Sequence, residues 1–230
     1  MNILISDPIR AAAPSFKVIT IEASVVNQPT PEPLWELITR AATDMRRVTE
    51  IPDINHRPAI LATRQAYKAL GKDPNRYRPA AEALSRRVVK GLELYRIDAL
   101  VDLINLLSLQ SGYSIGGFDM DAIDGDALTL GVGREGEPYE GIGRGSLNIA
   151  GMPVYRDNTG GVGTPTSDNE RTRLTLGTRR LLMCINVYGE EMPIDETIRM
   201  AVGLLEQYAA ATDIKVTIYD TDGHIINISL

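Results

Sequence analysis

Residues 97–110 form the segment that most restricts how this chain can fold. Nine of its 14 residues are Leu, Ile, Val or Ala, and its spacing predicts an α-helix over residues 98–107 that ends before Ser111-Gly112. A helix that is apolar almost all round is stable only in a protein interior. The rest of the chain must therefore pack around this helix.

Three polar residues interrupt the apolar helix. Asp98, Asp102 and Asn105 are spaced by four and three residues, so they share one helix face. A buried carboxylate needs a partner, because its desolvation is costly. Two interpretations remain open. In the first, Asp98 caps the helix and Asp102 pairs with Arg86 or Arg87. In the second, the polar face lines a binding pocket.

The flanking segments predict a mixed α/β or α+β fold. Apolar residues at helical spacing predict further helices at 34–48, 57–70, 79–89 and 193–211. Short apolar runs between turn residues predict strands at 3–5, 16–26, 127–132, 146–150, 152–155 and 181–188, with a closing hairpin of 214–219 and 224–230. Helices come first and most strands follow, which does not suit a regular doubly wound sheet. We expect one domain over residues 1–230.

The composition is that of a globular protein with few metal ligands. Of the 230 residues, 43% are hydrophobic and 23% are charged, so a sizeable core forms without a disulfide. Cys184 is the single cysteine, in an apolar strand where we expect a core residue, and there are two histidines. Residues 141–145 are rich in glycine but lack the Lys-Ser/Thr of a phosphate loop. We therefore expect no metal and no cofactor.

The charge balance restricts nucleic-acid binding to a local surface. The chain has 24 Lys and Arg against 30 Asp and Glu, a formal net charge of −6. An acidic protein binds RNA only through a basic patch. Arginines at 76, 78, 86 and 87 would form such a patch, or would be a solvated helix face with weak ion pairs. The N-terminus has no sorting signal and no apolar run reaches about 18 residues, so we expect a cytoplasmic protein outside the membrane.

Two further segments are predicted as loops. In residues 111–119, Gly116 and Gly117 would allow the backbone to approach a ligand closely. Residues 157–168 are rich in small polar side chains. Each segment suits either a binding loop or an ordinary connection.

The order and spacing of several short motifs are informative together. They are Arg78-Pro79, Glu82-Ala83-Leu84, Arg86-Arg87, Val101-Asp102, Asn105, Gly116-Gly117-Phe118-Asp119, Asp126, Gly136-Glu137, Tyr155-Arg156-Asp157 and Thr178. In this order they resemble the B3/B4 domain, the editing module of the bacterial phenylalanyl-tRNA synthetase beta subunit, which also occurs in stand-alone proteins. The resemblance runs from about residue 57 to 188, with 1–56 and 189–230 as flanking strands and helices. It implies helices packed on a β-sandwich-like sheet.

The resemblance also implies an activity and a set of site residues. In the synthetase this module hydrolyses the ester of tyrosine wrongly attached to the phenylalanine tRNA. Carried over, the catalytic neighbourhood is Asp102, Asn105, Gly116 and Gly117, where backbone amides and polar side chains would position a water. The substrate would contact Asp98, Phe118, Asp119, Asp157 and Thr164. The tRNA would contact Arg76, Arg78, Arg86 and Arg87.

The chain departs from the family pattern at three positions. Gly116 falls where the family loop typically has a histidine. Cys184 falls near the position of a glutamate that recognises the tyrosine hydroxyl in the family. Asp98 stands where the family usually has an asparagine. A site that selects a hydroxyl depends on such polar groups, so tyrosine selectivity is not implied. We expect a protein that binds tRNA or a small amino-acid-like molecule and deacylates aminoacyl-tRNA, without the means to charge tRNA. A non-catalytic RNA-binding module and a small-molecule binder or enzyme without RNA remain alternatives.

Overall fold

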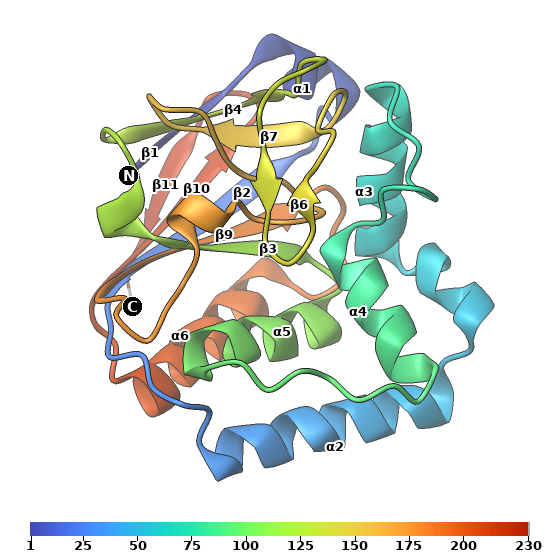
Figure 1. The fold of residues 1–230 in the computed structure, drawn as a ribbon, viewed down its shortest axis with the longest axis vertical. Helices are drawn as coiled ribbons and strands as arrows, with labels where there is room; N and C mark the ends of the chain where they lie inside the picture. The colour runs from blue at the N-terminus through green and yellow to red at the C-terminus, as the bar shows by residue number, and fades with distance from the viewer. Residues whose placement is uncertain (230) are drawn as a thin grey trace.

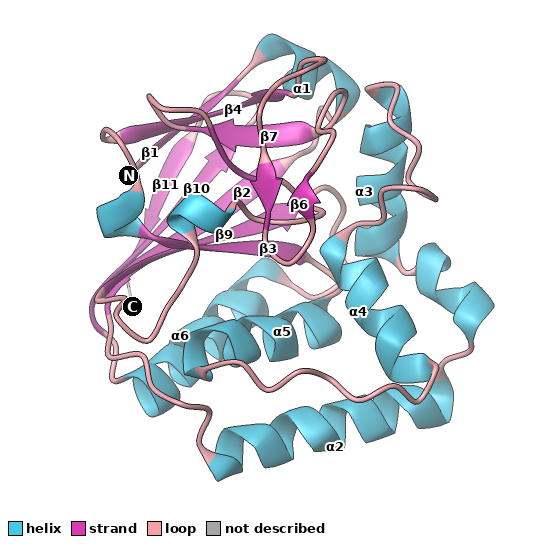
Figure 2. Cartoon of the chain, in the orientation of Figure 1, coloured by secondary structure: helices cyan, strands magenta, loops and turns pink. Residues whose placement is uncertain are grey.

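The computed structural model describes residues 1–229 and confirms a mixed α+β fold (Figures 1 and 2). A five-stranded sheet crosses the middle of the molecule. A smaller four-stranded sheet lies on one face of it, and helices cover the other face (Figure 2). This arrangement is the expected set of helices packed on a β-sandwich-like part.

The large sheet joins strands from distant parts of the chain. Its order is β11 (Ile225–Ile228), β10 (Thr212–Asp220), β2 (Lys17–Ser24), β9 (Arg180–Val187) and β3 (Ser114–Asp119), and every neighbouring pair is antiparallel. The small sheet has the order β1 (Asn2–Ile5), β4 (Ala127–Val132), β7 (Pro153–Arg156) and β8 (Gly161–Gly163). A short hairpin pairs β5 (Glu140–Gly141) with β6 (Gly145–Ser146). Strands from both ends of the sequence thus meet in one sheet.

The helices lie mostly on one side of the large sheet. The α-helices of residues 1–229 are α1 (Asp7–Ala12), α2 (Glu32–Val48), α3 (Pro58–Ala69), α4 (Ala80–Val89), α5 (Ala99–Ser111) and α6 (Ile194–Ala209). Short 3-10 turns are η1 (Ile51–His56), η2 (Met120–Ala122) and η3 (Glu170–Thr172). None of the helices among these described residues combines the length and apolarity needed to span a bilayer.

The two largest hydrophobic cores lie on opposite faces of the central strands, which are buried on both sides. On β9, Leu181 and Met183 belong to the core shared with α5 and α6, whereas Leu182 and Cys184 belong to the core between the two sheets. The alternation follows from the two-residue period of a strand. Cys184 is therefore a core residue, as predicted.

The predicted central helix is confirmed, and its C-terminal end lies four residues beyond the expected one, at Ser111. Leu100, Leu103 and Leu107 of α5 are fully buried. The helix begins after Asp98, whose Oδ1 accepts a hydrogen bond of 2.9 Å from the Val101 N–H. It continues to Ser111 because the first residue that leaves helical geometry is Gly112, with a left-handed φ of 75°.

Two predictions about local structure are wrong, and one short helix is not predicted. Residues 114–119 form the edge strand β3 rather than a loop, because pairing with β9 outweighs the weak strand preference of Gly116 and Gly117. Residues 146–150 contain only the end of β6, and the rest has no regular secondary structure apart from a turn at Ala150. The short helix α1 was not expected, although Asp7-Pro8 at its first turn is a typical helix start.

Candidate functional site

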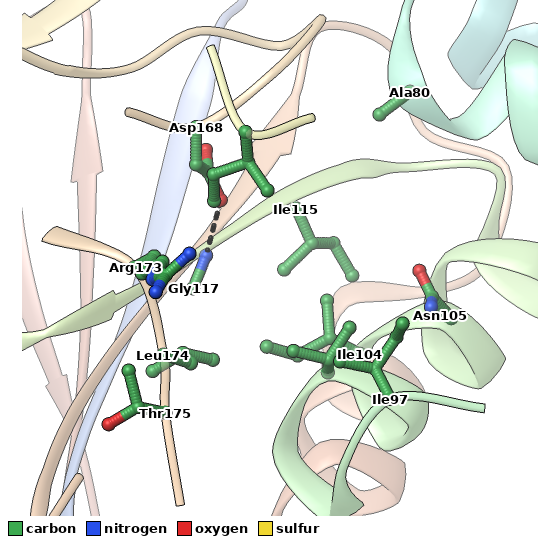
Figure 3. A pocket seen from close by; sticks show the side chains of 12 residues that line it. Ala80, Ile97, Ile104, Asn105, Ile115, Gly117, Asp168, Arg173, Leu174 and Thr175 are labelled. Carbon is green, nitrogen blue, oxygen red and sulfur yellow. Dashed lines mark hydrogen bonds between the residues drawn. The ribbon is translucent and has the colours of Figure 1, made fainter. Parts of the chain in front are cut away.

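A cavity of about 510 Å³ lies between α5, β3 and the segment that precedes β9 (Figure 3). Most of its wall is aliphatic, from Ile97, Val101, Ile104, Ile115, Ile142 and Leu174. Its polar groups are Asn105 on α5 and Asp168, Arg173 and Thr175 on the facing segment. An apolar cavity with a few converging polar groups is the usual form of a small-molecule site.

Asp168 is the acidic group of this cavity. Its Oδ2 accepts a hydrogen bond of 3.1 Å from the Gly117 N–H (Figure 3). Removal from water raises the pKa of Asp168 to about 7, and the Gly117 hydrogen bond acts in the opposite direction. A carboxyl group that titrates near neutral pH both accepts and releases a proton under ordinary conditions, as general acid–base chemistry requires.

Gly117 lies at the point where the strand edge meets the cavity. A Cβ atom at this position would lie 2.6 Å from Ile104 Cδ1 and 2.9 Å from Leu174 Cδ1. The close approach predicted for the glycine pair is therefore present, but its partners are apolar side chains. The Gly117 N–H is bound to Asp168 and is not free to stabilise an oxyanion. Gly116 lies next to it in β3 but does not line the cavity.

Of the polar face of α5, the structure brings only Asn105 to the cavity. Asp98 caps the helix, as the first interpretation predicted. Asp102 is almost fully buried and accepts hydrogen bonds from the Thr30 hydroxyl and the Ile97 N–H. Burial raises the pKa of Asp102, against the effect of these hydrogen bonds.

The predicted pairing of Asp102 with an arginine of the preceding helix is wrong. Arg86 instead binds Glu82 on its own helix, at 2.8 Å, and the Arg87 Nε donates to the Glu93 carbonyl at 2.6 Å. Residues four apart on a helix are neighbours, so Glu82 is the nearer carboxylate for Arg86.

The five predicted substrate contacts lie outside the cavity, and one of them, Asp98, is the N-cap of α5. Phe118 is buried between the sheets, with its ring centroid 6.5 Å from that of Tyr155. Asp119 accepts a hydrogen bond from the Thr178 hydroxyl, and the Asp157 carboxylate pairs with Arg171. Thr164 holds the turn before Asp168, since its Oγ1 accepts from the Ser167 N–H. These side chains are occupied by partners of the fold itself.

The four predicted RNA-binding arginines do come together in one groove. The groove, of about 270 Å³, is lined by Arg76, Arg78, Arg86, Arg87, Lys90 and Arg144, with Ala83 and Leu92. Among residues 1–229, no acidic side chain lines it. The fully buried Glu82 lies beneath, 2.8 Å from Arg86 and 3.9 Å from Arg78. We call this surface the basic groove.

The basic groove is continuous with the cavity. A third hollow of about 340 Å³ lies between them, and we call it the connecting channel. It shares Asn105 and Ile115 with the cavity, and Arg87 and Arg144 with the basic groove. The cavity, the connecting channel and the basic groove therefore adjoin one another in that order.

Asp168, Arg173 and Arg144 were missed by reasoning from the sequence. Asp168 ends the polar segment 157–168, whose small polar side chains suit a binding loop, but nothing in the local sequence distinguishes it from Asp157 or Thr164. Arg173 pairs with Glu170 at 2.8 Å and reaches the cavity from the following turn. Arg144 lies in the glycine-rich segment 141–145, which was set aside because it matches no phosphate-loop motif.

Comparison with known proteins identifies the family. A search of the curated proteins found no match. The structure is similar to an N-terminal fragment of the phenylalanyl-tRNA synthetase beta subunit from Pyrococcus horikoshii, with a TM-score of 0.50 and 12% sequence identity. The similarity covers 100% of this chain and 54% of the other, so this chain spans about half of that fragment. The family model described as the B3/4 domain matches residues 62–201, more than half of the sequence, and the chain therefore belongs to the B3/4 domain family.

Proposed function

We propose that this protein binds the acylated 3′ end of a tRNA and hydrolyses the ester between the amino acid and the terminal ribose. The continuity of an apolar cavity with a basic groove carries this proposal. An aminoacyl-tRNA has the same two parts, an amino-acid side chain and a phosphate backbone. The similarity to a synthetase subunit that acts on tRNA supports the same class of ligand.

The cavity fits an amino acid with an apolar side chain. A volume of about 510 Å³ lies within the ordinary range for small-molecule sites, and six aliphatic residues form its wall. Cys184, near the family's glutamate position, is buried between the sheets and is not part of the wall. A tyrosine hydroxyl would lose its water without gaining that carboxylate as a partner, so we expect apolar side chains to be preferred.

Asp168 is the proposed general base. In its ionised form it takes a proton from a water, whose oxygen then attacks the ester carbonyl carbon. The bond from this carbon to the ribose oxygen breaks, and the ribose oxygen receives the proton from Asp168. Asn105, on the facing helix, would donate to the carbonyl oxygen as negative charge develops there. This arrangement replaces the Gly116-Gly117 amides, because the Gly117 N–H is held by Asp168.

The basic groove supplies the binding of RNA. Arginine and lysine side chains neutralise phosphates locally even when the whole protein is acidic. Arg86 and Arg78 also interact with Glu82, so part of their charge is already balanced. We expect binding that weakens steeply with salt and that is lost when Arg76 and Arg87 are replaced by glutamate.

The test is deacylation of a panel of tRNAs, each charged with a different amino acid. We expect release of apolar amino acids faster than in buffer, and a loss of about 100-fold or more in Asp168→Asn, which is the usual contribution of a general base. Asp195→Asn is the matched control, because Asp195 is exposed on α6. If no charged tRNA loses its amino acid faster than in buffer, the hydrolytic function is refuted.

The alternative of a non-catalytic RNA-binding module rests on the basic groove alone. It predicts salt-dependent tRNA binding with no release of any amino acid. The second alternative, a small-molecule-binding function without RNA, rests on the cavity alone. It predicts that free amino acids stabilise the protein against heat and that the protein has no affinity for tRNA. The same panel, combined with tRNA binding and thermal-shift measurements, separates the three functions.

A further inference from the structure

Residues 91–97, between α4 and α5, expose apolar side chains beside the cavity and the basic groove. Leu92, Tyr95 and Ile97 are 50%, 68% and 57% exposed. Figure 1 shows this segment running from the end of α4, past α2, to the start of α5. Leu92 lines the basic groove and Ile97 lines the cavity, so Tyr95 lies on the stretch of chain that joins the two.

The Tyr95 ring is stacked with a cation of the basic groove. The Arg87 guanidinium lies 4.2 Å from the ring centroid, and Arg87 also lines the connecting channel. This contact occupies one face of the ring. Because Tyr95 is 68% exposed, the remaining ring surface is open to solvent.

Hydrogen bonds on both sides of Tyr95 hold the segment in place. Arg87 donates to the Glu93 carbonyl at 2.6 Å, and Arg96 donates to the Thr30 carbonyl at 2.6 Å and to the Glu32 carboxylate at 2.9 Å. These hydrogen bonds position the backbone on either side of Tyr95, and the Arg87 guanidinium contacts its ring, which lowers the entropy cost of binding to it.

We propose that Tyr95 and Arg87 form a stacking platform for an unpaired base of a single RNA strand whose phosphates lie in the basic groove. The platform rests on the proposed function, because it requires RNA in that groove. Aromatic rings beside a positively charged groove are the combination by which proteins bind single strands, since every base offers a flat face. In a duplex those faces are covered by neighbouring bases, so the platform fits an unpaired segment.

The test measures binding of a fluorescein-labelled 12-nucleotide single-stranded RNA by fluorescence anisotropy. We expect Tyr95→Ala to raise Kd by about 5- to 150-fold, the range that loss of one stacked base produces, and Tyr95→Phe to bind like the wild type. The dependence of Kd on salt should keep its slope in Tyr95→Ala, because no phosphate contact is lost. Ile225→Ala is the control for an exposed apolar side chain on the distant strand β11.

A second probe separates stacking from other roles of the ring. A strand of the same length with abasic sugars keeps the phosphates and removes the bases, so wild type and Tyr95→Ala should bind it equally. An equal loss on both strands overturns the platform, as does an unchanged Kd in Tyr95→Ala on the ordinary strand.

The outcomes also distinguish the platform from the proposed function. If Arg76→Glu abolishes binding while Tyr95→Ala does not alter it, RNA occupies the groove and only the platform fails. If Tyr95-dependent binding is found but no charged tRNA is deacylated, the platform stands and the hydrolysis fails. If wild type binds neither strand, the platform and the tRNA partner fall together.

Discussion

Replacing Asp168 by asparagine should stabilise the protein above about pH 7, although the same substitution should abolish its activity there. The folded state raises the pKa of this carboxyl from 3.8 to about 7, because its ionised form has lost water. Between these two values the folded protein binds more protons than the unfolded chain, so its free energy of unfolding falls as pH rises. Asparagine carries no charge and avoids this loss.

The size of the effect follows from the difference of about three between the two pKa values. At about 1.4 kcal/mol for each factor of ten, the raised pKa of Asp168 lowers the free energy of unfolding by about 4 kcal/mol at pH 8, where the group is ionised in both states. At pH 5 the folded group is still protonated, and the loss is about 2 kcal/mol. The asparagine Oδ1 can accept the same hydrogen bond from the Gly117 N–H, so the local geometry is kept. Asp168→Asn should therefore gain about 2 kcal/mol more over wild type at pH 8 than at pH 5.

Urea unfolding of both proteins at several pH values from 5 to 8 measures this difference. Asp195→Asn serves as the control and should show no trend of this size, since Asp195 is exposed. A stability difference that stays constant across this pH range would refute the proposed environment of Asp168. A difference that shrinks as pH rises would show that the carboxylate is stabilised by the fold, and would also refute it.

Three other substitutions test separate parts of the site. Asn105→Ala should lower kcat for deacylation with little change in KM if Asn105 binds the developing oxyanion, and an unchanged kcat would contradict that role. Glu82→Ala should lower the free energy of unfolding, measured in urea, by about 3–5 kcal/mol, because it leaves the buried Arg64 without its carboxylate partner. A loss below about 1 kcal/mol would contradict a buried ion pair. Gly117→Ala should lower the free energy of unfolding by about 1–3 kcal/mol, because the added methyl group overpacks the site. Gly203→Ala is the comparison, since Gly203 lies on α6 with open space around it, and it should raise the free energy of unfolding by about 0.5–1 kcal/mol. Equal effects of the two substitutions would contradict the close packing at Gly117.

The local features of the site could be predicted from the sequence. The apolar run around Leu103 and Leu107 predicts a buried helix, and Asp98 is a typical N-cap residue, because both properties depend on neighbours a few positions away. The spacing of Glu82 and Arg86 also indicates their ion pair. That Glu82 would be fully buried beneath the basic groove was not evident, since burial depends on the packing of α4 against other elements.

The contacts that define the cavity could not be predicted, because they join residues far apart in the sequence. Asp168 meets Gly117 across 51 positions, and this contact exists only once residues 114–119 have joined the sheet as β3. The two glycines favour a loop locally, and the strand forms because β9 supplies a partner. Asp102 was misassigned for the same reason, since its partner Thr30 lies on the approach to α2.

The most direct test of the account is single-turnover hydrolysis of a tRNA charged with an aliphatic amino acid, measured from pH 5 to 9. We predict that the wild-type rate rises with pH to a plateau above about pH 7, as Asp168 loses its proton. Asp168→Asn should bind the same tRNA with equal affinity but hydrolyse it at least about 100-fold more slowly at every pH above 7. Equal hydrolysis rates in the wild type and Asp168→Asn would contradict the assignment of this cavity as an ester-hydrolysing site. A wild-type rate no faster than the rate in buffer without protein would contradict it as well.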